Sequence, residues 1–149
     1  MQIHFKLAWL KEGKALRQGF GAGTQHLFED YLGRIHKFSP ASVSFAKQNQ
    51  KEKSGTKIWL CDRAAPKPVD SEGIALKLKG LLDSGTRSLE IYIGGPDGIS
   101  KEEKESLQPD FIWSFGPLTL PHELAAVVAA EQIYRAFTIL HNQPYHLGH

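Results

Sequence analysis

The residues best suited to chemistry lie near the C-terminal end of this chain. Glu131 and Arg135 are four positions apart within a run that predicts a helix, so both side chains belong to one helical face. A polar and aromatic tail, Tyr145-His146, follows Asn142-Gln143-Pro144, which ends the helix. By default, a glutamate–arginine pair of this spacing is an exposed ion pair worth about 0.3–0.5 kcal/mol. An ionisable tail behind a strand, a turn and a helix is also how α/β proteins build ligand sites.

Two loops, each following a short apolar run, are the candidate binding elements. The first, Gly94-Gly95-Pro96-Asp97-Gly98, follows a predicted strand and precedes a predicted helix. Its glycines let a ligand approach the backbone. Its pattern is neither GxGxxG nor a Walker loop, so a phosphate cradle is not predicted. Taken alone, a structural turn and a binding loop are equally good interpretations of this segment.

The second loop, Phe115 to Leu120, carries few charges. It offers backbone N–H and C=O groups beside apolar side chains. Such a lining suits a flat heteroaromatic ring such as adenine, which backbone hydrogen bonds can hold, and it suits a triphosphate poorly. The alternative is an ordinary connection between a strand and a helix.

The other polar features favour structural interpretations. Cys61 lies in an apolar run with no partner motif around it, so we expect a small core residue rather than a catalytic thiol. The histidines of the C-terminal tail match no strong zinc pattern, and no metal site is predicted. The connector Lys47 to Lys57 is typical of a solvated loop, with contact to RNA phosphates as the alternative. The loop around Gly13 to Gly23 is glycine-rich and basic, with Lys11, Lys14 and Arg17.

Alternating strands and helices must position these residues. Apolar runs predict five strands, at Ile3–Leu7, Val43–Phe45, Ile58–Cys61, Ser88–Ile93 and Phe111–Trp113. Spacing and capping residues predict four helices, at Gln25–His36 with Thr24 as cap, from Asp70 or Ser71 to Asp83, at Lys101–Leu107 after Ser100, and from Pro121 to Leu140. This order predicts an α/β fold with a mostly parallel sheet covered by helices on both faces, in one domain over residues 1–149.

Three of these helices carry apolar stripes; we expect the first two to point inward, and we interpret the third as part of the core or as a subunit contact. The stripes are Leu27, Phe28, Tyr31, Leu32 and Ile35 in the first helix, Ile74, Leu78, Leu81 and Leu82 in the second, and Ala126, Ala130, Ile133, Phe137 and Leu140 in the last.

Composition favours a soluble globular protein. Of 149 residues, 41% are hydrophobic and 23% are charged, and the net charge of +2 does not by itself indicate a nucleic-acid binder. The single cysteine excludes an internal disulfide framework and fits a reducing compartment, so we expect a cytoplasmic protein. No apolar run approaches the roughly 18 residues of a spanning helix, and the N-terminus lacks a signal-peptide pattern, so no membrane association is expected.

Four blocks of the C-terminal half occur in a specific order and spacing. They are IGGPDG at Ile93–Gly98, LTLPH at Leu118–His122, EQIYRA at Glu131–Ala136 and NQPYH at Asn142–His146. Together they resemble the RlmH-type SPOUT methyltransferases. Weaker similarity extends to EDYLGRI at Glu29–Ile35 and IWLCDR at Ile58–Arg63.

The resemblance implies both a function and a fold. Members of this family methylate N3 of a pseudouridine in large-subunit (23S) ribosomal RNA and use S-adenosyl-L-methionine as the cofactor. The implied fold is a parallel α/β sheet with a deep trefoil knot near its C-terminal end. The resemblance also implies a homodimer that holds the cofactor in the knot and binds ribosomal RNA across the subunit interface.

The same resemblance implies roles for individual residues. Cofactor contacts fall on Leu60, Gly94, Phe115, Gly116, Pro117, Leu118, Thr119 and Leu120. Glu131, Arg135, Tyr145 and His146 are then expected near the target base. Glu131 and His146 are the candidate acceptors of the N3 proton, Arg135 would favour the anionic base, and Tyr145 would stack on it.

The chain departs from the family pattern in two places. The family usually has a long helix where Lys47 to Lys57 forms a short connector, and it often has an arginine where this chain has Ala126. Two alternative functions are therefore kept: a SPOUT methyltransferase for a different RNA position, and a catalytically silent module that binds RNA or the ribosome.

Overall fold

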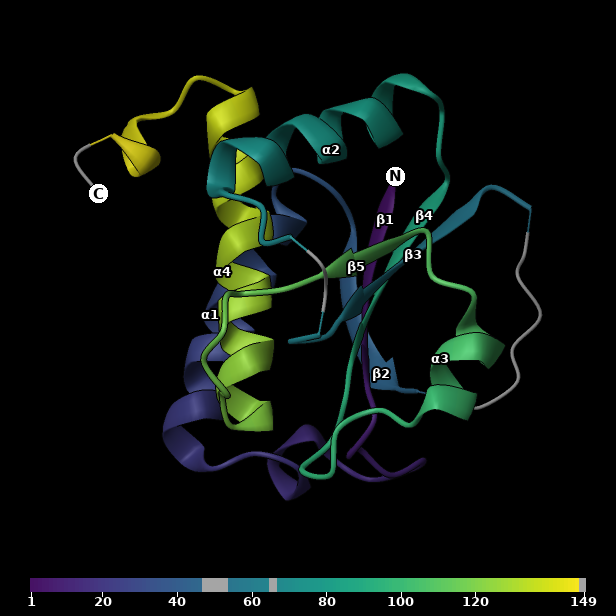
Figure 1. Cartoon of the computed structure of the whole chain (residues 1–149). Coiled ribbons are helices and arrows are strands. Elements are labelled where there is room, and N and C mark those ends of the chain that lie inside the picture. The colour runs from purple at the N-terminus through teal and green to yellow at the C-terminus, as the bar shows by residue number, and fades with distance from the viewer. Residues whose placement is uncertain (47–53, 65–66, 148–149) are drawn as a thin grey trace.

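A single parallel sheet forms the centre of the molecule. The computed structural model describes residues 1–46, 54–64 and 67–147, so most of the predicted lysine-rich connector, residues 47–53, lies outside the described residues. The sheet has five strands in the order β2-β1-β4-β3-β5, and every neighbouring pair is parallel (Figure 1). The strands are β1 Gln2–Leu7, β2 Ala41–Phe45, β3 Thr56–Cys61, β4 Ser88–Ile93 and β5 Phe111–Trp113.

Parallel pairing brings the carboxyl ends of four strands to one edge of the sheet. Ile93 at the end of β4 pairs with Leu7 of β1 on one side and with Cys61 of β3 on the other. Cys61 pairs in turn with Trp113, the last residue of β5. The loops that follow these strands therefore meet at one level, which is where ligands bind in open α/β sheets.

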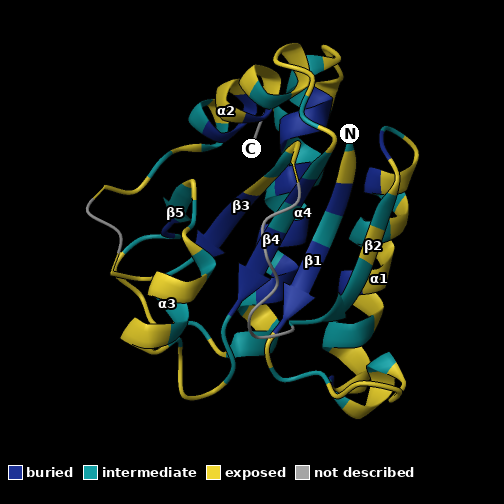
Figure 2. Ribbon diagram, turned by 90° about the vertical axis from the view of Figure 1, so that its right-hand side faces the viewer, coloured by how far each residue is buried: buried dark blue, intermediate teal, exposed yellow. Residues whose placement is uncertain are grey.

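Helices cover both faces of the sheet, as predicted. The helices α1 Ala22–His36, α2 Ser71–Asp83 and α4 His122–Leu140 lie on one face, with α4 packed against the other two. The short helix α3 Lys101–Leu107 lies on the opposite face, which Figure 2 presents to the viewer. There, Ile99 and Leu107 pack against the buried side chains of Ile58, Leu60 and Tyr92. The α/β class and the predicted order of elements are confirmed.

The main core lies between the sheet and the three-helix layer. Because side chains alternate along a strand, β1 sends Ile3, Phe5 and Leu7 into this core, and all three are fully buried. Phe5 meets Phe28 of α1 edge to face, with 5.5 Å between the ring centroids. Each such side chain contributes about 1.5–3 kcal/mol when it is fully buried. This burial orients β1 and α1, and with them the loop between the two elements.

α4 passes through the middle of the helical layer (Figure 1). The face that was predicted to be core or a subunit contact is part of the core: Ala126, Ala130, Ile133 and Phe137 are buried, and Leu140 is half-buried. Neither α4 nor any other helix of the described residues combines the length and the apolar character needed to cross a membrane.

Two predicted helix starts are confirmed by their caps. At α2, the carboxylate of Asp70 accepts a hydrogen bond of 2.8 Å from the N–H of Gly73. At α3, Ser100 and Glu103 form a reciprocal capping box, with both hydrogen bonds at 3.1 Å.

The predicted start of the first helix is wrong. α1 begins at Ala22 with Gly21 at the N-cap, so Thr24 lies inside the first turn. The cap comes from Glu123, at the start of α4, whose Oε1 accepts hydrogen bonds from the N–H of Gly21 at 2.5 Å and from the hydroxyl of Thr24 at 2.7 Å. Glu123 is 102 residues away from Gly21, so no local pattern could have predicted this cap.

Two leucines predicted to face inward are exposed. Leu27 of α1 is 45% exposed and Leu82 of α2 is 37% exposed. Each is adjacent in sequence to a residue that does pack inward, Phe28 and Leu81 respectively. Because each residue is turned by about 100° from the last in a helix, a stripe defined by spacing alone is wider than the face that a neighbouring helix covers.

Candidate active site

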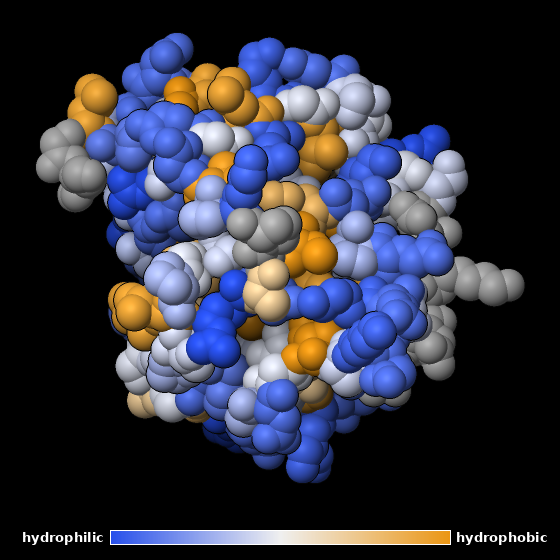
Figure 3. Space-filling view, in the orientation of Figure 1, coloured by the Kyte–Doolittle hydropathy of each residue, from blue (hydrophilic) through white to orange (hydrophobic). Residues whose placement is uncertain are grey.

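A cavity of about 750 Å³ opens at the carboxyl edge of the sheet. Its volume lies within the roughly 300–1,000 Å³ that is usual for small-molecule sites. Residues 61–63 after β3, residues 93–99 around the end of β4, and residues between 113 and 125 line it. These are the loops that the register of the sheet brings together. On the face seen in Figure 3, a strip of apolar surface runs between polar areas over the region of β5.

The loop after β4 is built for close backbone approach. Gly94 lies directly against the following turn: a Cβ added there would be 2.7 Å from Cγ1 of Ile99 and 3.1 Å from the carbonyl carbon of Gly98. The turn is closed by a hydrogen bond of 2.9 Å from the N–H of Gly98 to the carbonyl of Gly95. Gly98 has a φ of +77°, which favours glycine. The cavity wall at Gly94 is therefore bare backbone.

The loop after β5 presents backbone groups beside apolar side chains. Buried Ser114 accepts a hydrogen bond of 3.1 Å from the N–H of Gly116, whose φ is +102°. This local turn directs Phe115 and Leu118 to the cavity lining, and Leu118 is 73% exposed. An apolar, backbone-rich wall of this kind suits a planar heteroaromatic ring.

Charged side chains surround the mouth of the cavity. A guanidinium N–H of Arg63 donates to the hydroxyl of Thr119, which joins the loops after β3 and β5. Asp62 forms an ion pair with Lys104 of α3. Burial by itself raises the pKa of Asp62, but the hydrogen bonds from Lys104 and from the N–H of Ala64 lower it below its usual value. Among the described residues, Arg63 is the only lysine or arginine that lines the cavity. It forms no ion pair with a described carboxylate, although its charge helps to lower the pKa of the neighbouring Asp62.

Six of the eight predicted cofactor positions line this cavity: Gly94, Phe115, Gly116, Leu118, Thr119 and Leu120. The other two do not. Leu60 is fully buried on the face of the sheet that α3 covers. The next residue, Cys61, lines the cavity instead. Pro117 is exposed outside the lining. Burial raises the pKa of the Cys61 thiol, so that it stays protonated at neutral pH.

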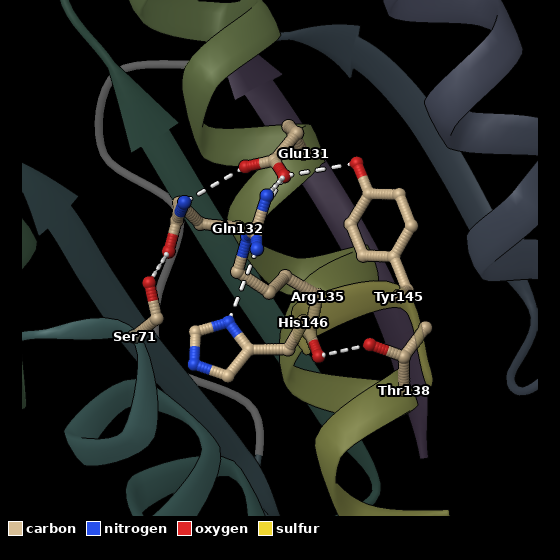
Figure 4. A network of polar contacts seen from close by, with 7 residues as sticks. All are labelled: Ser71, Glu131, Gln132, Arg135, Thr138, Tyr145 and His146. Carbon is tan, nitrogen blue, oxygen red and sulfur yellow. Dashed lines mark hydrogen bonds and ion pairs between the residues drawn. The ribbon is translucent and has the colours of Figure 1, made fainter. Parts of the chain in front are cut away.

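The four predicted catalytic residues form a second site, a hydrogen-bonded network between α4 and the C-terminal tail (Figure 4). Glu131 Oε1 accepts from Nε and Nη2 of Arg135, at 2.9 and 2.6 Å, and from the hydroxyl of Tyr145 at 3.0 Å. Its other oxygen accepts from the side-chain amide of Gln132 at 2.7 Å. The guanidinium of Arg135 lies 4.8 Å from the centroid of the Tyr145 ring.

His146 extends this network to α2. Its Nδ1 is 3.1 Å from Nη1 of Arg135, and its Nε2 is 2.8 Å from a carboxylate oxygen of Glu72. Because arginine can only donate, Nδ1 must accept, and the proton of the neutral ring then lies on Nε2 and is donated to Glu72. The bond from His146 lowers the pKa of Glu72. Both ring nitrogens of His146 are thus occupied.

The phenol of Tyr145 is held in its neutral form. Burial raises its pKa, and the hydrogen bonds with Tyr31 and Glu131 raise it further. Its ring also meets the ring of Tyr134 at 4.7 Å between centroids. Tyr145 is thus a donor and an aromatic surface rather than a base.

In one chain, the network and the cavity are apart. None of Glu131, Arg135, Tyr145 and His146 lines the cavity, whose last lining residue on α4 is Ala125. With a rise of 1.5 Å per residue, Glu131 lies about 9 Å and Arg135 about 15 Å further along the helix axis. The two predicted halves of the site are each assembled, but they are not brought together within the chain.

Several functional candidates were not predicted from the sequence. Asp62, Arg63 and His122 line the cavity, and their positions just after a strand or at the start of a helix were the available signal. Glu72, Gln132 and Ser71 support the network, with Ser71 donating to Gln132 at 2.7 Å. They carried no signal because their partnership depends on how α2 packs against α4.

Within the described part of the chain, no group of three or more His, Cys, Asp or Glu side chains could hold a metal ion.

Comparisons with known proteins agree with this arrangement. Residues 21–146 match a family model described as "Predicted SPOUT methyltransferase". A protein of Magnetococcus marinus named ribosomal RNA large subunit methyltransferase H is 34% identical over 141 residues, which cover 80% of this chain and 87% of that protein. Proteins of the same name from Bartonella bacilliformis and Methylorubrum populi are 42% and 46% identical over 91 residues. Those two matches cover 61% of this chain and 55% and 54% of the respective relatives.

The matched range spans β2 to β5, the loops that line the cavity, and the residues of the network. The match therefore spans the positions of both sites, and the family is consistent with the parallel α/β fold. This chain belongs to the SPOUT methyltransferase family, as an RlmH-type member.

Proposed function

We propose that this chain transfers a methyl group from S-adenosyl-L-methionine to N3 of a pseudouridine in large-subunit (23S) ribosomal RNA, in the cytoplasm. The observation that carries the proposal is the cavity at the ends of β3, β4 and β5, in a chain of the SPOUT methyltransferase family. Relatives aligned over as many as 141 residues are named ribosomal RNA large subunit methyltransferase H.

The lining of the cavity fits this methyl donor in three respects. The apolar, backbone-rich loop from Phe115 to Leu120 suits an adenine ring. Gly94 packs directly against Ile99 and Gly98, which keeps the loop after β4 tight and leaves its backbone at the cavity wall. Arg63 offers a guanidinium to a carboxylate such as that of the methionine moiety. S-adenosyl-L-methionine supplies a methyl group that is already activated on a sulfonium, so the protein has mainly to position the two reactants.

Glu131 serves as an anchor in this proposal. Its Oε1 accepts three hydrogen bonds and its Oε2 accepts one, so neither oxygen is free to take a proton in this arrangement. It holds the guanidinium of Arg135, which can stabilise negative charge on the target base. It also holds the hydroxyl of Tyr145, whose ring can stack on that base.

His146 is the better acceptor for the N3 proton. Its Nε2 proton is donated to Glu72, whose side chain is 61% exposed, so solvent screens this contact between the tail and α2. If the tail moves so that Arg135 no longer donates to Nδ1, that nitrogen becomes a free base. RNA phosphates near Arg135 would favour this change by competing for its guanidinium.

A second copy of the chain completes the site in this proposal. The network of one chain begins about 9 Å along α4 from its own cavity, which is too far for a group that must touch the transferred methyl and the target base together. A homodimer with a two-fold axis can place the network of each chain at the cavity of the other.

The proposal is tested by incubating the protein with large ribosomal subunits from a bacterial strain that lacks this methylation, using labelled methyl donor, and then mapping the modified nucleotide. We expect label at N3 of one pseudouridine in the large-subunit RNA. Label at another nucleotide would favour the alternative of a SPOUT enzyme for a different position. Calorimetry with S-adenosyl-L-methionine completes the test, because a chain that binds RNA but not the methyl donor would be a silent binding module.

A further inference from the structure

A second, smaller pocket lies in the segment between β1 and α1. Its volume is about 180 Å³, below the range usual for whole small-molecule ligands. Trp9, Lys11, Lys14, Gln18 and Gly19 are among the residues that line it. The pocket thus combines an aromatic ring with two lysines, at a size that suits one planar group.

This pocket is fixed by hydrogen bonds. The indole N–H of Trp9 donates to the carbonyl of Gly19 at 2.8 Å, which joins the two ends of the segment. The N–H of Lys14 donates to the carbonyl of Lys11 at 3.1 Å, so the two lysines lie at the ends of one tight turn. At Gly19, an added Cβ would be 2.5 Å from Leu10 and 3.3 Å from the Trp9 ring. Glycine at this position therefore lets the backbone approach the Trp9 ring without displacing the end of the Leu10 side chain.

Three cations on this segment have no acidic partner. Lys11, Lys14 and Arg17 are all exposed, and no carboxylate of the described residues lies within ion-pair distance of any of them. Lys57, Lys79, Lys104, Arg34 and Arg135 each pair with an aspartate or a glutamate, but Lys37, Lys67, Lys77, Arg87 and Lys101 form no ion pair among the described residues either. What distinguishes Lys11, Lys14 and Arg17 is that they lie close together in the sequence, with Lys11 and Lys14 lining the same pocket as the Trp9 ring. Unpaired cations next to an aromatic surface are typical of sites for single-stranded nucleic acid.

The small pocket adjoins the methyl-donor cavity. The ring of Trp9 meets the ring of His122 edge to face at 4.6 Å, and His122 lines the larger cavity. A Cβ added to Gly95, also in that lining, would be 3.8 Å from Cβ of Trp9. The segment after β1 and the loop after β4 lie side by side at the lower end of Figure 1. The segment after β1 is therefore within reach of nucleotides that flank a base held at the larger cavity.

We propose that the segment from Trp9 to Gly19 binds a single-stranded stretch of the substrate RNA that flanks the methylated nucleotide. Lys11, Lys14 and Arg17 contact phosphates, and a base lies against Trp9 in the small pocket. The inference rests on the proposed function, because it takes RNA as the substrate, and it names the RNA-binding surface of that same site.

The electrostatic part is tested with the double variant Lys11→Gln/Lys14→Gln and purified large-subunit ribosomal RNA. The dissociation constant is measured over a series of salt concentrations. Each phosphate contact on single-stranded RNA contributes about 0.7 to the slope of log K against log salt, so two lost contacts lower the slope by about 1.4. The matched control is Lys37→Gln/Lys101→Gln, which removes the same charge from two exposed positions elsewhere and should leave the slope close to that of the wild type.

Equal slopes for the two double variants would overturn the inference while leaving the proposed function intact. If the wild-type protein itself does not bind the RNA, the proposed function fails, and the inference fails with it. Calorimetry with S-adenosyl-L-methionine should give the wild-type affinity for both variants, which excludes a general loss of folding.

The contact with Trp9 is tested by photocrosslinking. Ribosomal RNA that carries 4-thiouridine is irradiated in complex with the wild-type protein, and the crosslinked peptide is identified by mass spectrometry. We expect the crosslink between residues 9 and 19. Crosslinks confined to other segments, such as the face of the sheet that α3 covers, would show that the RNA follows another path.

Discussion

Arg63 illustrates how a single side chain can determine the selectivity of the cavity. It is the only lysine or arginine in the lining among the described residues, and its guanidinium meets a hydroxyl, that of Thr119, rather than a carboxylate. It is thus available for an anionic group of a ligand. Nothing in its local sequence distinguishes Arg63 from an ordinary charged residue after a strand.

Replacing Arg63 by Met should weaken the binding of S-adenosyl-L-methionine by about 10- to 100-fold, because a hydrogen bond to a charged group contributes about 1.5–3 kcal/mol. Methylthioadenosine, which lacks the carboxylate, should bind as well as it does to the wild type. Calorimetry with both ligands checks this. The matched control is Arg87→Met, which lies before β4 at the opposite edge of the sheet. Equal losses for the two ligands would contradict a contact with the carboxylate.

The network around Glu131 makes a separate prediction about rate. Arg135→Ala should lower the single-turnover rate of methylation by about 10²-fold or more, because it removes stabilisation of the charge that develops on the base. Tyr145→Phe keeps the ring and loses only the hydrogen bond to Glu131, so it should retain more activity than Tyr145→Ala. His146→Ala should be slow if the imidazole accepts the proton. If all of these variants keep the wild-type rate while binding the methyl donor normally, the network has no catalytic function.

At the scale of elements, strands and helices were predicted well because their signals are local. Apolar runs located all five strands, and Asp70 and Ser100 marked the starts of α2 and α3. The start of α1 was missed because its cap, Glu123, belongs to α4. This contact joins the first and last helices at the same end of the sheet as the cavity, so it supports the position of the loop before α4.

Replacing Glu123 by Ala should lower the free energy of unfolding by about 1 kcal/mol at neutral pH, in the range of a lost N-cap. The hydrogen bonds from Thr24 and from the N–H of Gly21 lower the pKa of Glu123. A carboxyl group whose pKa is lowered on folding stabilises the folded state fully at pH values above the pKa of the same group in the unfolded chain, about 4.3. This contribution is lost as the pH falls through the pKa of the folded state. The difference in the free energy of unfolding between the wild type and Glu123→Ala should therefore become smaller at acid pH.

Urea unfolding at several pH values measures this difference. Glu105→Ala, an exposed glutamate on α3, is the matched control and should change stability less. If Glu123→Ala lowers the free energy of unfolding by the same amount at every pH, the charge of the Glu123 carboxylate contributes nothing to stability.

At the scale of the whole molecule, the cavity and the network occupy different parts of one chain, and the proposed homodimer follows from that separation. The trefoil knot near the C-terminal end, and a single domain over residues 1–149, stay predictions from the family resemblance. If each site is shared between two chains, mixing two inactive variants gives a result that a site within a single chain cannot give.

A mixture of two inactive variants should regain activity. Gly94→Val places a side chain against Ile99 and disables the cavity, and Arg135→Ala disables the network. In a 1:1 mixture allowed to exchange subunits, half of the dimers are mixed, and each mixed dimer has one intact site if the site is shared. The expected activity is about a quarter of the wild-type value. No recovery, with exchange verified by differently tagged subunits, would place each complete site in a single chain.

The sequence by itself determined the order and type of the elements, because hydrophobic periodicity, turn residues and capping residues act over a few positions. It also marked the two loops and the four polar residues that form the two sites. Only the tertiary structure decided which of these residues meet: that Arg63 reaches Thr119, that Glu72 holds His146, and that Glu123 caps α1. These contacts join residues 56 to 102 positions apart, and their partners are set by strand register and helix packing, which no local pattern encodes.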